Sequence, residues 1–228
     1  MPTQFALTYP FSRSQVLQIL KGVEIAPSID NLSSEDRRIA YFRTVSQLSK
    51  GQIKALPYYA LGGGLVTSNY QLSQFGICVL KHDPLLDLRS TQWLIHYYMS
   101  APSGPGPLYW HKVVCKRLHP GNNFTAADVE ADIVAVEREY RDRALSARSV
   151  ESARVALTST YTNDDGLGAL GILSSVDRSR YLVQEPDPPS VWVFGLALLD
   201  YWRATYGEGR LTINLDDLSA PGALGDLF

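Results

Sequence analysis

The sequence predicts a mostly α-helical protein with small β-hairpins, arranged as one or two winged-helix units around a central apolar helix. Serine-capped segments with apolar residues at helical spacing recur along the chain. Short alternating segments flank polar turns in 65–72 and again in 171–183. The stretch 90–99 is apolar on nearly every side, as in a helix at the centre of a core. We expect an N-terminal winged-helix-like domain over 1–120 and a C-terminal helical domain with a second hairpin over 121–228.

Composition narrows the class of protein. The chain has 228 residues, of which 45% are hydrophobic and 19% are charged, as in an ordinary globular protein. The net charge of −2 argues against a protein that coats nucleic acid with its whole surface. There is no run of 18 apolar residues and no secretory signal pattern, and the two cysteines fit a reducing compartment. We therefore expect a cytoplasmic protein without a membrane span.

The first half of the chain predicts several helices and a hairpin. A helix over 14–21 precedes one over 35–48, and Ser49 caps a third that begins at Lys50. Pro57 removes a hydrogen bond from this third helix at a cost of about 3 kcal/mol, so the helix either bends there or breaks before Tyr58. Glycines 62–64 end it, and 65–67 and 70–72 form a hairpin before a helix capped by Ser73.

The second half continues the helical pattern. A helix capped by Ser90 runs to Met99, and a proline-glycine loop separates it from a helix over 108–118. Thr125 and Ser149 then cap two further helices, and a hairpin pairs 171–176 with 181–183. A strongly amphipathic helix over 191–206 and a short strand over 211–215 complete the chain.

The basic residues indicate a nucleic-acid surface. Five cations and no acid lie between Arg37 and Lys54. On the helix that starts at Lys50, we predict that Lys50, Lys54 and Tyr58 face a DNA groove. The preceding segment then contacts phosphates through Arg37, Arg38 and Arg43. The turn of the second hairpin holds Arg178 and Arg180, which suit a second, weaker contact with phosphate oxygens. An ordinary solvated surface is the alternative for both groups.

Catalytic and metal-binding patterns are missing. His96, His111 and His119 do not have the spacing of metal ligands, and there is no CxxC pair. Glycines 62–64 follow a helix and lack the GK[ST] ending of a phosphate-binding loop. The pair Asp164-Asp165 fits a turn. We expect no catalytic residue, no metal and no cofactor, and hence no enzymatic activity.

Several motifs together resemble a known family. They are Lys50, Tyr58-Tyr59, Leu72-Ser73-Gln74-Phe75-Gly76, Asp83-Pro84-Leu85-Leu86-Asp87, Trp93-Leu94-Ile95-His96 and Tyr109-Trp110, with a matching tail over 211–228. This pattern resembles a bacterial domain family of unknown function found beside phage-defence genes, including DNA phosphorothioation and BREX-like systems. The likeness covers most of 48–118 and the C-terminus.

The resemblance implies a winged-helix role on DNA in antiviral defence. The chain would be a non-enzymatic accessory subunit of a prokaryotic defence or DNA-modification system, with double-stranded DNA and other defence-system proteins as partners. The alternative is a scaffold subunit that holds a larger defence complex together through protein contacts. The near-neutral charge and the aromatic-rich helices favour that alternative.

Overall fold

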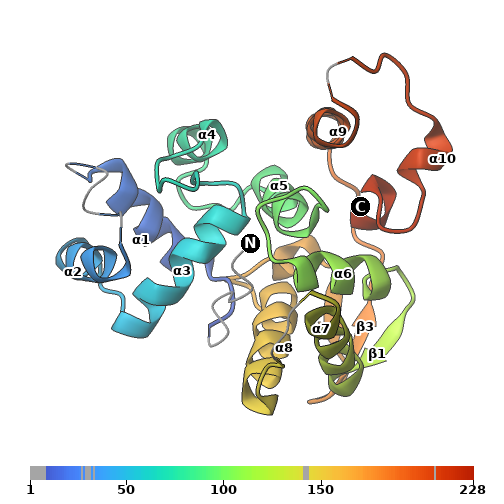
Figure 1. The fold of residues 1–228 in the computed structure, drawn as a ribbon, viewed down its shortest axis with the longest axis horizontal. Helices are drawn as coiled ribbons and strands as arrows, with labels where there is room; N and C mark the ends of the chain where they lie inside the picture. Colours follow the sequence, from blue (N-terminus) through green and yellow to red (C-terminus); the bar gives the residue numbers. More distant parts are fainter. Residues whose placement is uncertain (1–8, 27, 29–31, 33, 141–143, 208) are drawn as a thin grey trace.

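The computed structural model describes residues 9–26, 28, 32, 34–140, 144–207 and 209–228. Within these residues the protein is mostly helical and has one small antiparallel sheet, which confirms the predicted fold class. In Figure 1 the N-terminal helices lie on one side, α5 lies centrally, and the sheet and its helices occupy the opposite side. The helices are α1 (Arg13–Glu24), α2 (Glu35–Val45), α3 (Lys50–Gly62), α4 (Gln74–His82), α5 (Arg89–Ser100), α6 (Leu108–Arg117), α7 (Ala126–Tyr140), α8 (Ala147–Thr162), α9 (Val191–Tyr206) and α10 (Leu215–Leu218). Two short 3-10 helices are η2 (Gly168–Leu170) and η3 (Leu224–Leu227).

Helix α3 starts and runs as its sequence predicts. The Ser49 side chain accepts from the backbone N–H of Gln52, and the Gln52 side chain accepts from the backbone N–H of Ser49, which forms a capping box. The helix continues through Pro57, which is buried, so the alternative of a break before Tyr58 is wrong. Burial of Ile53, Leu56 and Tyr59 beside the proline stabilises the helix against the lost hydrogen bond.

The first predicted hairpin is present in its smallest form. Val66 and Leu72 form an isolated antiparallel bridge, and the described residues between α3 and α4 contain no longer strand. The backbone N–H of Ser73 donates to the Leu65 carbonyl at 3.0 Å, and this is one of the two hydrogen bonds that flank the bridge. A Cβ atom on Gly76 would lie 2.0 Å from the Leu65 oxygen. The start of α4 therefore lies directly against the bridge, so the pair does not extend into longer strands.

The second half holds a sheet between helices. Its order along the chain is α6, β1 (Asn123–Thr125), α7, α8, β2 (Leu173–Ser175) and β3 (Arg180–Val183). The three antiparallel strands lie in the order β1-β3-β2, with Phe124 opposite Tyr181 and Leu173 opposite Val183. The second predicted hairpin is thus confirmed, and β1 is an addition to it. Helix α8 packs on α7 and on β2.

Helix α5 is the central helix that the sequence predicts. Its residues from Thr91 to Tyr97 are all buried. It begins at Arg89 rather than after a Ser90 cap, because the Asp83 carboxylate accepts from the backbone N–H groups of Asp87 and Leu88 at 2.9 and 3.0 Å. The buried Asp83 thereby orders the turn that leads into α5.

The C-terminal part packs on α5 through α9 and η3. Helix α9 has the predicted bounds. The predicted strand over 211–215 is wrong, because residues 211–214 form no regular structure and Leu215 begins α10. Leu211 is 88% exposed. The domain boundary at residue 120 stays a prediction, and α6 and α7 pack together across it. Within the described ranges, no helix is long and apolar enough to cross a bilayer.

Candidate nucleic-acid interface

The first basic surface consists of Arg37, Arg38, Arg43, Lys50 and Lys54 on α2 and α3, with Tyr58 beside them. The Lys54 ammonium forms an ion pair with the Glu35 carboxylate, with an Nζ–Oε1 distance of 2.6 Å. This hydrogen bond lowers the pKa of Glu35, and the charges of Lys54, Arg38 and Lys50 add to the effect. An acid from outside the cation-rich segment thus neutralises part of the surface.

The other members of this surface differ in how they are held. Arg38 lies over the Tyr70 ring, 4.4 Å from its centroid, and donates to the Leu32 carbonyl at 3.0 Å. Tyr58 is half-buried against the core, so only part of its ring faces outward. Arg37, Arg43 and Lys50 are exposed. The surface therefore combines exposed cations with a lysine that is paired with an acid.

The second group of basic residues, called the second basic surface, is Arg148 in the first turn of α8 and Arg178 at the turn between β2 and β3. Arg178 is exposed and Arg180 is held back by Asp177, whose carboxylate accepts from the Arg180 side chain at 2.6 Å. The backbone N–H of Ser179 and the Arg180 side chain lower the pKa of Asp177 to about 2. Of the two predicted arginines, Arg178 is the one that the described contacts leave available to a ligand.

Arg148 and Arg154 flank the predicted start of the helix before the second hairpin, and their contacts differ. It is exposed in the first turn of α8, whose N-terminus is capped by the Ser146 hydroxyl. No ion pair involves Arg148 in the part of the chain that the structure describes, whereas Arg154 pairs with Glu130 at 3.2 Å. The signal in the sequence was the arginine in the first turn of a helix that precedes a hairpin.

Two other cations near the sheet are taken up by one acid. Lys116 and Arg117 both lie 2.5 Å from the carboxylate of the buried Asp132. This arrangement satisfies a charge that would otherwise be costly to bury. Lys116 and Arg117, in the basic run that begins at His111, therefore connect α6 to α7 rather than forming a ligand surface.

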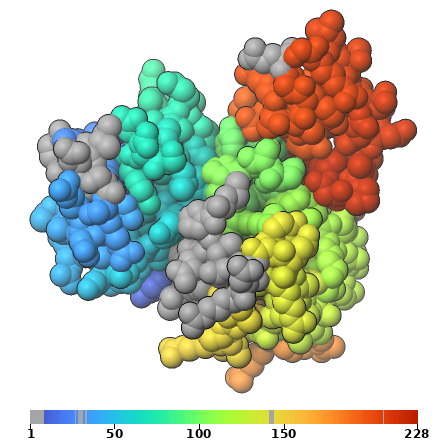
Figure 2. All heavy atoms as spheres, viewed as in Figure 1, coloured from blue at the N-terminus to red at the C-terminus, as the bar shows by residue number. Residues whose placement is uncertain are grey.

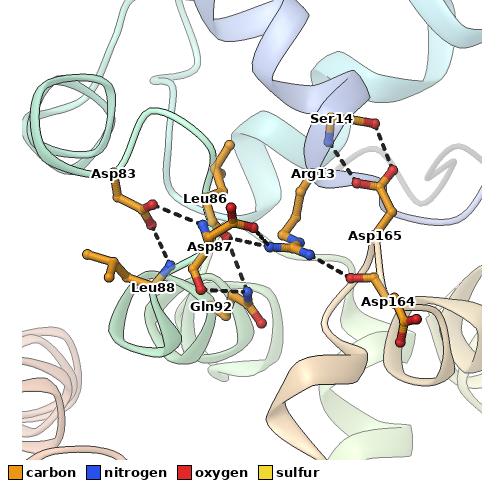
Figure 3. A network of polar contacts seen from close by, with 9 residues as sticks. All are labelled: Arg13, Ser14, Asp83, Leu86, Asp87, Leu88, Gln92, Asp164 and Asp165. Carbon is orange, nitrogen blue, oxygen red and sulfur yellow. Dashed lines mark hydrogen bonds and ion pairs between the residues drawn. The ribbon is translucent and has the colours of Figure 1, made fainter.

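A polar network joins the start of α1, which packs on α3, to the segment after α8 (Figure 3). The Arg13 guanidinium contacts the Asp87 carboxylate and donates to the carbonyls of Leu86 at 3.2 Å and Asp164 at 2.6 Å. The Asp165 carboxylate accepts from the Ser14 hydroxyl at 2.7 Å and from its backbone N–H at 3.1 Å. The network fixes the position of one basic surface relative to the other, and it gives Asp164 and Asp165 a structural role.

The buried histidines have structural partners. His96 donates from Nε2 to the Leu227 carbonyl and accepts at Nδ1 from the Tyr161 hydroxyl, both at 2.7 Å. Burial lowers the pKa of His96 to about 4, so the ring is neutral at pH 7. Throughout the described chain, no three His, Cys, Asp or Glu residues gather in a group that could hold a metal ion.

Comparison with known proteins identifies a shared fold. No protein-family model and no curated protein matches the chain. The crystal structure of SspB is similar over 97% of this chain and 71% of its own, with a TM-score of 0.68 and 19% sequence identity. A magnesium ion-bound SspB structure matches over the same shares, with a TM-score of 0.68 and 18% identity. These likenesses establish that the chain has the fold of SspB.

Proposed function

We propose that the protein is a cytoplasmic, non-enzymatic DNA-binding subunit of a prokaryotic antiviral defence or DNA-modification system. One observation carries this proposal. The order helix, strand, helix, helix, strand, strand from α6 to β3, with the strands in the order β1-β3-β2, is that of a winged helix. In this fold the helix before the hairpin, here α8, enters the major groove, and the hairpin lies along the backbone.

The local chemistry supports this orientation. The N-terminus of α8 carries the positive end of a helix dipole, and exposed Arg148 adds a full charge there. Arg178 at the tip of the hairpin suits a bidentate contact with a phosphate group. Both groups contact the duplex through charge rather than through base edges, so we expect phosphate contacts to dominate.

The first basic surface, on α2 and α3, also belongs to the proposed interface. Its exposed members, Arg37, Arg43 and Lys50, supply phosphate contacts of the same kind. The Arg13 network keeps this surface in a constant position relative to α8. A duplex that contacts both would be bound by few charges, in keeping with the net charge of −2.

The defence setting rests on two supports. The motifs between Lys50 and Trp110 resemble a family found beside phage-defence genes, and the fold is shared with SspB. Both supports are consistent with an accessory subunit that works with other defence-system proteins.

Salt-dependent duplex binding tests the proposal. We expect the double variant Arg148→Ala, Arg178→Ala to weaken binding and to lower the log–log dependence on salt by roughly one unit for each lost contact. The matched control is Lys21→Ala, Lys81→Ala, which removes two exposed cations from α1 and α4. If both double variants lost the same affinity for duplex, the loss would come from the change in net charge alone. That result would contradict an interface at α8.

A protein-interaction scaffold is the second candidate function. The observation that favours it is the apolar outer face of α9, where Trp192 is 84% exposed. A wild-type protein that does not bind duplex at low salt would favour this candidate over DNA binding.

A further inference from the structure

Helix α9 carries an apolar face that no described residue covers. Its inner face packs on the core through Val193, Ala197 and Tyr201. On the opposite side Trp192 is 84%, Leu196 46% and Leu199 56% exposed. This spacing of four and three residues places them in one row along the helix, and we call this row, together with Gly195, the α9 stripe. The sequence from Val191 to Leu199 contains no charged residue.

A stripe of this size is costly to leave in water. Helices on a protein surface normally turn polar residues outward. Together with Val191, which is 75% exposed, the stripe presents roughly 500 Å² of apolar surface, at the upper end of what a monomer shows. Two such faces together bury about 1,000 Å², which reaches the lower bound for a specific interface between two proteins.

Gly195 points to a helix as the covering element. A Cβ atom added there would meet no other atom within 4 Å, so the packing of this chain does not require glycine. Glycine inside a helix costs about 1 kcal/mol relative to alanine. The cost of a glycine is offset where a second backbone or side chain must approach the helix closely. Gly195 leaves a notch on the helix surface, beside the side chain of Leu196.

We propose that the α9 stripe binds the α9 stripe of a second copy of this chain, with the two helices antiparallel. A two-fold axis between Gly195 and Leu196 places Leu196 of each copy in the Gly195 notch of the other. The same axis places Trp192 opposite Leu199. The stripe thus carries both the protruding side chain and the notch that receives it, which is the self-complementarity that a two-fold interface requires.

The stripe is also held rigidly enough to serve as an interface. The Tyr97 hydroxyl on α5 donates to the Asp200 carboxylate at 3.0 Å. The Phe194 ring packs on Phe228 with a centroid distance of 5.6 Å, and Phe228 stacks on Tyr97 at 6.2 Å. Figure 1 shows α9 at the margin of the molecule, in the orange-red part of the chain (Figure 2). A rigid face loses little conformational freedom on association.

Sedimentation equilibrium of two charge variants tests the proposal. Leu196→Arg puts a cation into the stripe, whereas Ile77→Arg makes the same change on α4 at a position that is 47% exposed, against 46% for Leu196. We expect the wild type and Ile77→Arg to dimerise, and the dissociation constant of Leu196→Arg to rise by about a hundredfold or more, since the charge would be buried unpaired. A wild type that stays monomeric at high micromolar concentration, or a dimer that both variants keep, would overturn the proposal.

Cross-linking gives a second measurement that does not depend on a disruptive charge. Leu196→Cys lies next to the proposed axis, and Ala204→Cys is an exposed position farther along the same helix. Both are made in a Cys78→Ser background, because Cys78 is exposed. We expect mild oxidation to join two chains through position 196 and not through position 204. Equal yields at the two positions would contradict the antiparallel arrangement. Neither readout involves DNA, so failure here leaves the proposed function untouched.

Discussion

Lys54 on α3 and Glu35 on α2 form an ion pair with an Nζ–Oε1 distance of 2.6 Å, within a surface that the sequence suggested was purely basic. The two residues lie 19 positions apart, and both side chains are about half exposed, at 46% and 48%. The pair therefore costs little to separate, and a phosphate group can compete with Glu35 for the lysine.

Removing the acid should strengthen DNA binding. In Glu35→Gln the Lys54 ammonium has no carboxylate beside it, so we expect higher affinity for duplex and a steeper dependence on salt. The double variant Lys50→Ala, Lys54→Ala should lower the slope by roughly one unit for each lost contact. Fluorescence anisotropy over a salt series measures both. If the log–log dependence on salt were the same in both variants as in the wild type, α3 would not be part of the interface.

The hairpin arginines should act unequally. Asp177 holds Arg180, whereas Arg178 is exposed at the turn, so Arg178→Ser should account for most of the loss seen when both are replaced by serine. If the hairpin contacts an adjacent stretch of duplex, the loss will be larger for long duplexes than for short ones. A length series at constant salt measures this. The same loss at every length would mean that no second stretch is contacted.

Two tryptophans provide a matched comparison of core and surface. Trp93 is 2% exposed and Trp192 is 84% exposed. Trp93→Ala should lower the free energy of unfolding by about 3–5 kcal/mol, because it leaves a cavity beside Phe228 and His96. Trp192→Ala should change it by less than about 0.5 kcal/mol in dilute, monomeric protein. Urea unfolding monitored by circular dichroism distinguishes them, and similar losses in both variants would contradict the assignment of Trp93 to the core.

His96 should make the fold sensitive to mild acid. Burial lowers its pKa to about 4, below the value of about 6.5 for an unfolded histidine, so the unfolded chain binds a proton more readily. Its contribution is complete above pH 6.5 and declines as the pH falls toward 4, with a total of roughly 3 kcal/mol. Burial also lowers the pKa of His111, which therefore acts in the same direction.

The variant His96→Gln isolates this effect, because glutamine can donate and accept hydrogen bonds but does not titrate. We expect its urea midpoint to depend much less on pH between 6.5 and 4.5, while some dependence from His111 remains. A pH dependence identical to that of the wild type would show that His96 is not the buried titrating group.

Local signals predicted much of the fold. The capping box at Ser49, the cap at Ser73 and the apolar pattern of 191–206 each depend on residues within a few positions of one another, so the helices followed from the sequence. The first hairpin is limited to one bridge because Gly76, at the start of α4, lies against the backbone of Leu65. Strand β1 has three residues and exists only through its pairing with β3, which comes much later in the chain.

The candidate site was less predictable for the same reason. The charge of Arg178 or Lys54 is visible in the sequence, but its availability depends on partners from other elements. Glu35 lies outside the run that suggested a basic surface, and Asp132 removes Lys116 and Arg117 from the surface of α6. Arg148 precedes the second hairpin in the sequence, but the third strand of that sheet comes from β1, which lies before α7.

The position of Arg13 has a consequence for how the protein reaches its native state during synthesis. Arg13 bonds to the Asp164 carbonyl, 151 residues later, and the Phe11 backbone N–H donates to the Thr160 hydroxyl, 149 residues later. The segment around residues 11–14 also contacts Tyr59 on α3 and Leu86 before α5, but its contacts with the end of α8 form only after that helix has been made. Contacts between such distant residues slow folding. Helix α1 can therefore pack on α3 early, whereas its attachment to the end of α8 waits for most of the chain.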